Sequence, residues 1–290
     1  MTIIIGFEFE FGWLPEIQSN MSIAKKTKKP IYFEKHIYPE VYQEINDYFS
    51  NSSQIISEIK EDPTIKFSKK YYDNFYGVEV VTNPVNYDNA KIFLVSFLDW
   101  MKENKKIKTN STCSLHINIS FLDEHKSEQI DYLNLINLVP QSEILNEFKR
   151  AKNNYCINTF NKKFSIIING NISKERSYFY WINKKHNYKS LKFLSNKINY
   201  GCLIYNKNNP KTISKLSFNS ECEYENFIKK SFINRLNISG KNISIVDKRN
   251  IINQRYFEFR MIGNKDYELK KEYILLSIDK FIDSIRKSLP

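Results

Sequence analysis

Three stretches of the chain alternate apolar and polar residues, and each predicts a β-strand with one buried face. They cover residues 3–12 (IIIGFEFEFG), 113–121 (CSLHINISF) and 256–262 (YFEFRMI). Successive side chains of a strand point to opposite faces, so the apolar residues of each stretch would share the core face. The other face would then carry three polar pairs, which are Glu8 and Glu10, His116 and Asn118, and Glu258 and Arg260.

The spacing of apolar residues elsewhere predicts helices. We expect them at residues 40–59, 88–103, 127–138 and 270–289. Asp88 is the expected N-cap of the second of these helices. The β-branched run at residues 77–82, GVEVVT, predicts a further strand that ends at the turn Asn83-Pro84.

The middle of the chain has a weaker pattern. Between about residues 160 and 230, short apolar runs alternate with stretches rich in Lys and Asn, which predicts short strands and long loops. The sequence contains no internal repeat and no Gly/Ser-rich or Pro-rich linker. We therefore expect a single domain over residues 1–290, with a divergent, elaborated middle region at 160–230.

The chain is basic, with a formal net charge of +12 from 44 Lys+Arg against 32 Asp+Glu. Such an excess can attract a nucleotide, a nucleic acid or another anionic polymer. It can also follow from an A- and T-rich genome, because Lys, Asn, Ile, Phe and Tyr are abundant and Gly is scarce. We favour this compositional explanation, and we interpret the basic run at residues 25–29 as a solvated loop rather than a lid over a substrate.

Cysteine spacing and hydrophobicity bear on the cellular location. The four cysteines are scattered without a CxxC pair, which argues against a zinc knuckle or a thioredoxin-like motif and favours reduced thiols. No apolar run reaches the roughly 18–20 residues of a membrane span. The first residues lack the basic and apolar regions of a signal peptide. We therefore expect a cytoplasmic location, in the host cell if the protein is encoded by a phage, and no membrane association.

Five pieces of the sequence occur in an order that is informative as a whole. The pieces are Gly6-Phe7-Glu8-Phe9-Glu10, the stretch GVEVVTNP at 77–84, Cys113-Ser114-Leu115-His116-Ile117-Asn118, Arg150 before Tyr155-Cys156, and Asn250 or Asn253 before Glu258-Phe259-Arg260. Together they resemble the small amidoligase family of phages and bacteria, within the glutamine synthetase and gamma-glutamylcysteine ligase superfamily. Two positions depart from the family pattern: its glycine before the histidine is Ser114, and its second histidine is Asn118.

The resemblance implies a fold and an activity. The fold would be the glutamine-synthetase-like catalytic fold of the α+β class, a mostly antiparallel curved sheet with helices packed on one face. The activity would be that of an ATP-dependent carboxylate-amine ligase acting on small-molecule or peptide substrates. ATP phosphorylates the carboxylate to an acyl phosphate, and an amine then displaces the phosphate. ATP and Mg²⁺, or Mn²⁺, would be required, because metal ions neutralise and align the phosphates.

The resemblance also implies two cation sites. One cation would be bound by Glu8, His116 and Glu258, and the other by Glu10 and Glu79. Carboxylate oxygens are the ligands that Mg²⁺ prefers, and one imidazole among them is compatible with Mg²⁺ or Mn²⁺. A different explanation of the carboxylates is a solvated sheet face, and Glu79 fits the alternating pattern least well.

Arginines and one amide complete the site that the resemblance implies. Arg260 would meet the transferring phosphoryl group, where a positioned positive charge stabilises the transition state. Asn118 and Arg150 are further catalytic candidates, and Arg249 and Arg255 are candidates for the ATP phosphates. Each arginine also has a simpler explanation, because Arg260 could form an exposed ion pair with Glu258, Arg150 could pair with Glu143 or Glu147, and Arg249 and Arg255 could be plain surface.

Two other functional classes stay open. A non-catalytic phage structural or nucleic-acid-binding protein could keep the ligase-like fold, and the basic charge and the change at Asn118 permit it. A metal-dependent nuclease or hydrolase would also use clustered carboxylates and one histidine. The sequence lacks an obvious second base for such a hydrolase, so the ligase is the favoured hypothesis.

Overall fold

The computed structural model describes residues 2–15, 37–49, 55–67, 75–123, 126–151 and 256–290, together with shorter segments between residues 159 and 247. The chain forms two compact units, of which the first comprises Met1–Lys152 and Asn250–Pro290. The second unit, Asn153–Arg249, takes up the middle region for which the sequence predicts an elaboration of a single domain.

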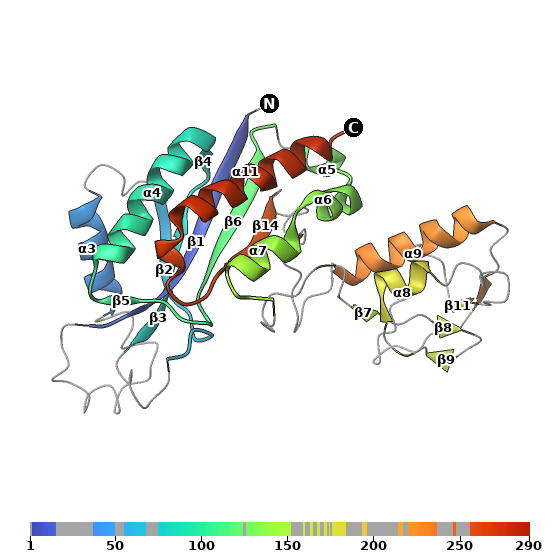
Figure 1. The fold of residues 1–290 in the computed structure, drawn as a ribbon, viewed down its shortest axis with the longest axis horizontal. Helices are drawn as coiled ribbons and strands as arrows, with labels where there is room; N and C mark the ends of the chain where they lie inside the picture. Colours follow the sequence, from blue (N-terminus) through green and yellow to red (C-terminus); the bar gives the residue numbers. More distant parts are fainter. Residues whose placement is uncertain are drawn as a thin grey trace. The chain divides into compact units, whose positions relative to one another are not determined.

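An antiparallel sheet forms the centre of the first unit (Figure 1). Its strands include β1 (Ile3–Trp13), β2 (Ile56–Glu61), β3 (Tyr76–Thr82), β4 (Val85–Asn86), β5 (Ile107–Lys108), β6 (Ser114–Phe121) and β14 (Phe257–Gly263). Across the sheet they follow in the order β14-β6-β1-β3-β2, and β4 and β5 also pair with β1. The four strands that the sequence predicts are confirmed as β1, β3, β6 and β14.

Helices cover the apolar face of this sheet. The helices of the first unit include α3 (Tyr38–Tyr48), α4 (Tyr87–Glu103), α5 (Lys126–Gln129), α6 (Tyr132–Leu138), α7 (Gln141–Glu147) and α11 (Lys271–Lys287), with a short 3₁₀ helix η6 (Tyr267–Leu269). Phe9 of β1 stacks on Phe97 of α4 with ring centroids 4.0 Å apart. Phe259 of β14 stacks on Phe281 of α11 at 4.3 Å. The α+β class with an open antiparallel sheet is therefore confirmed (Figure 1).

The alternation of β1 explains why one face of the sheet is core. Ile3, Ile5, Phe7, Phe9 and Phe11 are all at most 4% exposed, and they occupy the odd positions of the strand. Burying a large apolar side chain stabilises the fold by about 1.5–3 kcal/mol. The even positions, which include Glu8 and Glu10, must then lie on the face opposite to α4 and α11.

Two predicted helices differ in the structure. The helix expected at 40–59 ends at Tyr48, and β2 begins at Ile56. The intervening run of Ser and Asn at 50–53 is a poor helix former, and the two β-branched isoleucines that follow favour a strand. The helix expected at 127–138 is divided into α5 and α6, because the Asp131 side chain accepts hydrogen bonds from the backbone N–H groups of Leu133 and Asn134 and starts a new helix.

The N-cap of α4 is Asn86, and the prediction of Asp88 is wrong. The Asn86 side chain accepts a hydrogen bond from the Asn89 N–H at 2.9 Å, while Asp88 lies inside the first turn. Asn86→Ala is therefore expected to lower the free energy of unfolding by about 1 kcal/mol. Asp88→Ala is the matched control and should cost less, because a first-turn carboxylate contributes only through the helix dipole. Urea denaturation would measure both, and a larger loss at Asp88 would contradict the assignment.

The described strands of the second unit are short, as the sequence predicts, but the unit also contains a long helix. Its strands and helices are β7 (Lys163–Phe164), β8 (Ile167–Ile168), β9 (Asn171–Ile172), β10 (Arg176–Ser177), α8 (Tyr178–Ile182), β11 (Phe193–Ser195), β12 (Ser214–Leu216), α9 (Glu221–Leu236) and β13 (Val246–Asp247). The helix α9 was not expected. Tyr224, Ile228 and Phe232, spaced at i, i+4 and i+8, form its buried stripe.

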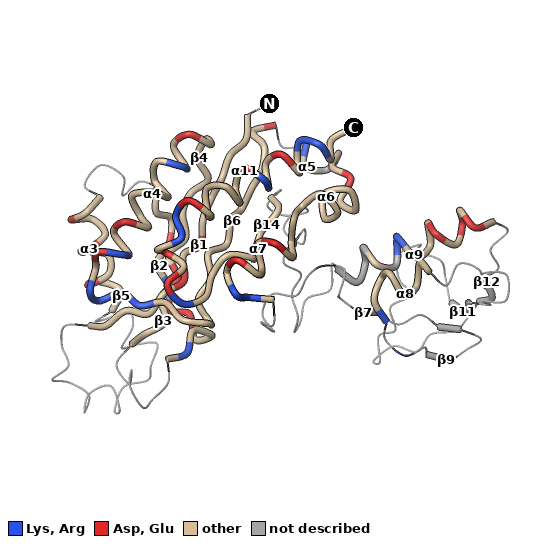
Figure 2. The backbone as a smooth tube through the Cα atoms, viewed as in Figure 1, with Lys and Arg blue, Asp and Glu red and all other residues tan. Residues whose placement is uncertain are grey.

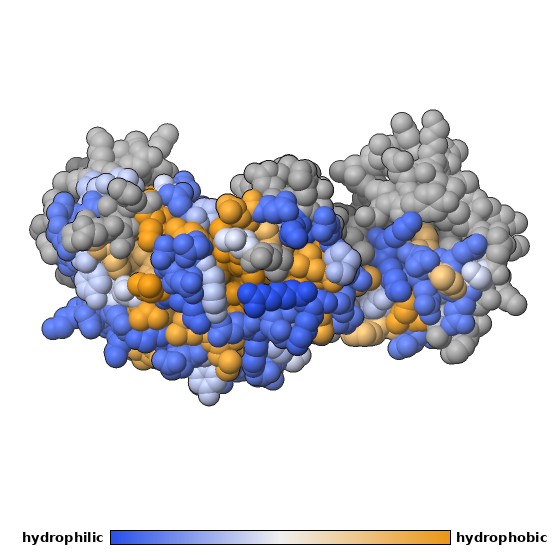
Figure 3. Space-filling model, turned by 90° about the horizontal axis from the view of Figure 1, so that it is seen from above, coloured by the Kyte–Doolittle hydropathy of each residue, from blue (hydrophilic) through white to orange (hydrophobic). Residues whose placement is uncertain are grey.

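The surface of the described helices mixes both charges. Figure 2 shows Lys and Arg interspersed with Asp and Glu on α4 and α11, so neither helix carries a stripe of one sign. Exposed apolar residues such as Ile92 and Leu276 occur on the same helices, and the face in Figure 3 likewise mixes hydrophilic and hydrophobic residues. Among the described residues, none of the helices has the length and apolar character needed to cross a bilayer.

Candidate metal site

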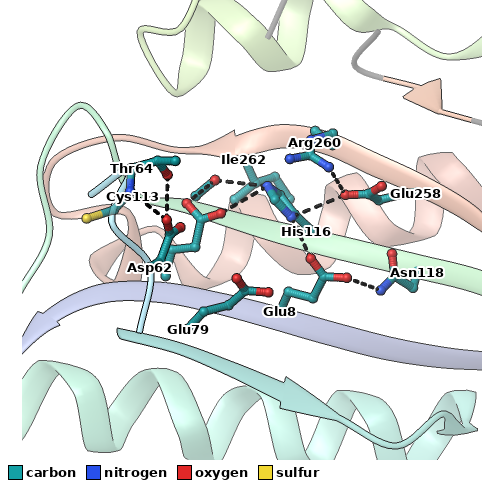
Figure 4. Close-up of polar contacts among 12 residues, drawn as sticks. Glu8, Asp62, Thr64, Glu79, Cys113, His116, Asn118, Glu258, Arg260 and Ile262 are labelled. Atoms are coloured by element: carbon teal, nitrogen blue, oxygen red, sulfur yellow. Dashed lines mark hydrogen bonds and ion pairs between the residues drawn. The ribbon is translucent and has the colours of Figure 1, made fainter. Parts of the chain in front are cut away.

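The strand register brings three predicted ligands together. Glu8 of β1 lies directly opposite His116 of β6, and Glu258 of β14 lies opposite Asn118, two residues further along β6. Because side chains two residues apart share a face, these four residues lie on the sheet face away from the helices. Figure 4 shows Glu8, His116 and Glu258 pointing toward one another from these three adjacent strands. We call these three residues the Glu–His cluster.

A β-bulge shapes the β14 side of the cluster. Phe259 pairs with Ile117 and Ile262 with Leu115, so β14 advances three residues while β6 advances two, with His116 opposite the bulge. A bulge re-aims side chains and breaks strict alternation. Met261 and Ile262 can therefore both be buried, while the Arg260 guanidinium forms an ion pair with Glu258 beside the cluster (Figure 4).

The geometry of the Glu–His cluster suits one divalent cation. His116 Nδ1 lies 2.8 Å from Glu8 Oε2 and 3.2 Å from Glu258 Oε1. One ligand atom from each residue lies within 4.8 Å of the others. Metal–oxygen distances of about 2.0–2.6 Å require ligand atoms no more than about 4–5 Å apart, so these residues fit a cation.

The side-chain amide of Asn118 lies next to the cluster and has one unpaired acceptor. Its Nδ2 donates a hydrogen bond to Glu8 Oε1 at 2.8 Å. Its Oδ1 is a buried acceptor without a hydrogen-bond partner in the described part of the protein. Leaving a buried acceptor unpaired costs about 1–3 kcal/mol, so a hydrogen-bond donor next to Oδ1, such as water, would stabilise this arrangement.

The other two predicted metal ligands are engaged differently. Glu10 lies opposite Glu79 in the register, but the Ser114 hydroxyl donates a hydrogen bond to Glu10. Glu79 forms an ion pair with Lys60 Nζ at 3.1 Å. Glu10 is nevertheless close to the cluster, because its Oε1 lies 3.4 Å from His116 Nε2. The structure thus places Glu10 and Glu79 beside the Glu–His cluster, each with a protein partner.

Burial and hydrogen bonding set the charges of the cluster. Burial alone would raise the pKa of Glu8, but hydrogen bonds from His116 and Asn118 and the nearby Arg260 charge outweigh it and lower the pKa to about 2. Burial and the Arg260 charge lower the pKa of His116 to about 4, against the effect of Glu8. At neutral pH the cluster therefore offers a carboxylate and a neutral imidazole, which is the protonation state that a metal requires.

The pKa of Glu10 is raised, in contrast to that of Glu8. Burial raises its pKa to about 8, despite the hydrogen bond from Ser114, and the charges of Asp62 and Glu79 act in the same direction as burial. Burial and the Glu8 charge also raise the pKa of Glu79, against the effect of Lys60. In the metal-free protein Glu10 therefore holds its proton at neutral pH, and a cation that bound to this carboxyl group would have to displace that proton.

The metal-free protein is expected to lose stability as the pH rises from 5 to 8. Glu10 keeps its proton to about pH 8 when folded but releases it near its ordinary pKa of 4.5 when unfolded, so its contribution to stability is fully present below pH 4.5 and is lost as the pH rises through about 8. Glu10→Gln should weaken this decline. Melting temperatures of both proteins across this pH range, with a chelator present, would measure the difference, and parallel curves would contradict the shift.

Arg150 is placed by its contacts with the backbone. It is 3% exposed, and its Nη1 donates to the carbonyl oxygens of Cys113 at 3.1 Å and Ile262 at 2.9 Å. Cys113 directly precedes β6, the strand of His116, and Ile262 lies in β14, the strand of Glu258. Gly263 lies beside them with φ +145°, and a Cβ there would clash with Nη1 of Arg150. These contacts hold the two strands together, and the catalytic role of Arg150 stays a prediction.

Several predicted residues lie outside the described part of the chain. Arg249 and Arg255, the candidates for the ATP phosphates, are among them. The same holds for the basic run at 25–29, for Tyr155-Cys156, and for Asn250 and Asn253. Their proposed roles stay predictions.

Two residues near the site, Lys60 and Asp62, were not identified from the sequence. Lys60 was not considered because a helix was predicted at 40–59, where the structure has the start of strand β2. Asp62 is 8% exposed, its carboxylate accepts hydrogen bonds from the N–H and hydroxyl of Thr64 at 2.7 Å, and its charge acts on Glu10 and Glu79. The alternation of Glu58 and Lys60 was the available signal for one strand face.

Comparison with known proteins gives no relative. No protein-family model matches the chain, and no curated protein or solved structure shows significant similarity to it. The amidoligase resemblance therefore rests on the five sequence pieces and stays a prediction.

Proposed function

We propose that the protein is an ATP-dependent carboxylate-amine ligase with a glutamine-synthetase-like fold. The observation that carries this proposal is the convergence of Glu8, His116 and Glu258, with Arg260 beside them, on one face of an antiparallel sheet. An exposed polar face would not bury these groups, yet His116 is 4% and Glu258 3% exposed. Charged residues are seldom buried to this extent unless they are paired or bind a ligand.

The residues have distinct tasks in this proposal. Glu8, His116 and Glu258 would hold a divalent cation, which supplies charge neutralisation for the phosphates of ATP when it is bound. The Arg260 guanidinium would stabilise the negative charge on the transferring phosphoryl group. Asn118 has one free acceptor, Oδ1, which can receive a hydrogen bond from a substrate amine or from water.

The ion pair between Arg260 and Glu258 is compatible with the binding of an anion next to Arg260. The Arg260 side chain is 21% exposed, while Glu258 is 4% exposed. A guanidinium has five N–H donors, so Arg260 can keep a contact with Glu258 and still donate to a phosphate. This geometry favours a nucleotide next to the cluster rather than a metal that serves only to hold the fold together.

The most direct test is product formation. The purified protein would be incubated with ATP, Mg²⁺ and pools of amino acids or short peptides, and ADP and phosphate would be measured. We expect ADP only when a suitable carboxylate and amine are both present. Absence of ADP with every pool would contradict the ligase. Nucleic-acid binding that survives about 0.2 M salt would then favour the non-catalytic alternative.

A further inference from the structure

A series of hydrogen bonds through Ser114 links the Glu–His cluster to Glu10. His116 Nε2 lies 3.0 Å from Ser114 Oγ, and the Ser114 hydroxyl is hydrogen-bonded to Glu10. All three groups are buried, since Ser114 and His116 are each 4% exposed and Glu10 is 6% exposed. Ser114 is also one of the positions at which the chain departs from the family pattern, which has a glycine there.

The donors and acceptors in this series of hydrogen bonds are those that a metal-bound His116 would require. If Nδ1, which faces Glu8 and Glu258, gives its lone pair to a cation, the imidazole proton must sit on Nε2. Nε2–H then donates to Ser114 Oγ, and the Ser114 hydroxyl donates to a carboxyl oxygen of Glu10. Metal-binding histidines usually donate their second N–H to such an orienting partner. Glu10 therefore has a task that does not require it to touch a metal.

Lys60 supplies a positive charge where a second cation is expected. It lies opposite Glu79 in the β2–β3 register, and Glu79 in turn lies opposite Glu10 in the β3–β1 register. Its Nζ is 3.1 Å from Glu79 and 3.6 Å from Glu58. Lys60 is 43% exposed, so the ion pair contributes little to stability. Its position is what matters here, because a divalent cation between Glu10 and Glu79 would lie close to the positive charge of Lys60.

We propose that the chain binds a single divalent cation, at Glu8, Nδ1 of His116 and Glu258, and that Ser114 and Glu10 are positioning residues for His116. This inference rests on the proposed function for the identity of the first cation site. The family resemblance implies a second cation site at Glu10 and Glu79. In this inference Glu10 instead accepts the hydrogen bond from Ser114, and the Lys60 ammonium group pairs with Glu79.

The experiment counts bound Mn²⁺ on the full chain. Mn²⁺ would be titrated into the metal-free protein, and the electron paramagnetic resonance signal of free Mn²⁺ would give stoichiometry and affinity without reference to activity. We expect one Mn²⁺ per chain. Ser114→Ala should keep one site but bind it about 10–100-fold more weakly, as is typical when an orienting partner is lost. Ser120→Ala, on the same strand face of β6, is the matched control and should bind like the parent.

Further variants separate the possible failures. Glu10→Gln should still bind one Mn²⁺, because an amide oxygen can accept the Ser114 hydrogen bond. Two Mn²⁺ per chain in the parent, or an affinity unchanged by Ser114→Ala in a variant shown to be folded, would overturn the inference. ADP formation with two bound Mn²⁺ would support the proposed ligase function and overturn the single-cation inference. One bound Mn²⁺ without ADP from any amine pool would support the single-cation inference and contradict the ligase. If no Mn²⁺ bound, both the inference and the metal site of the proposed function would be contradicted.

Discussion

Replacing Glu258 with glutamine is expected to remove cation binding and with it ATP turnover. Glu258 is 3% exposed, lies 3.2 Å from His116 Nδ1 and is one of the three groups that can share a cation. A neutral amide has nearly the same shape but cannot supply the negative charge that a divalent cation requires. Turnover should fall by more than the roughly 10–100-fold that follows the loss of an outer-shell partner.

The fold should survive this substitution. The glutamine side-chain oxygen can still accept a hydrogen bond from Arg260, so no buried donor is left unpaired. Thermal melts would show this directly: Mn²⁺ at about 100 times its dissociation constant should stabilise the parent by about 2.7 kcal/mol and should leave Glu258→Gln unchanged. Glu143→Gln, which affects an exposed ion pair with Lys280, is the matched control. Equal metal-induced shifts in the parent and Glu258→Gln would place the cation elsewhere.

Strand alternation carried most of the correct sequence predictions. Between Phe7 and Phe11 of β1, apolar and carboxylate residues alternate, so both the core face and the position of Glu8 follow from the period of two. The same holds for His116 in β6. Order along the chain does not reveal which strands are neighbours, so the sequence predicted one shared sheet but not the pairing of β1 with both β3 and β6.

The errors arise where local pattern and tertiary structure disagree. The sequence YFEFRMI alternates cleanly, yet the bulge in β14 buries two consecutive residues, Met261 and Ile262. Bulges depend on the pairing of two strands, which a single strand cannot reveal. Lys60 was missed for a related reason, because its partner Glu79 belongs to a different strand and helical spacing was extended past Tyr48. The polar contacts of Arg150 with two carbonyls are likewise tertiary.

Replacing Arg260 with methionine is expected to lower ATP turnover by about 10³-fold or more while leaving Mn²⁺ binding intact. A positioned arginine at a transferring phosphoryl group is worth about 10³–10⁵ in turnover. Methionine keeps the apolar stem but removes the charge, and it frees Glu258 from its ion pair. Because Arg260 is a cation beside the cluster, its removal should maintain or strengthen binding of Mn²⁺.

The contrast between the two substitutions separates the two roles. Glu258→Gln should lose metal and turnover together, whereas Arg260→Met should lose turnover alone. Arg260→Lys tests geometry, because lysine restores the charge without the planar fork of donors and should recover only part of the rate. Arg286→Met, near the end of α11, is the surface control and should retain full turnover. If Arg260→Met turned over ATP at the parent rate, the guanidinium would serve only to pair with Glu258, and the phosphoryl group would have to be stabilised by other residues.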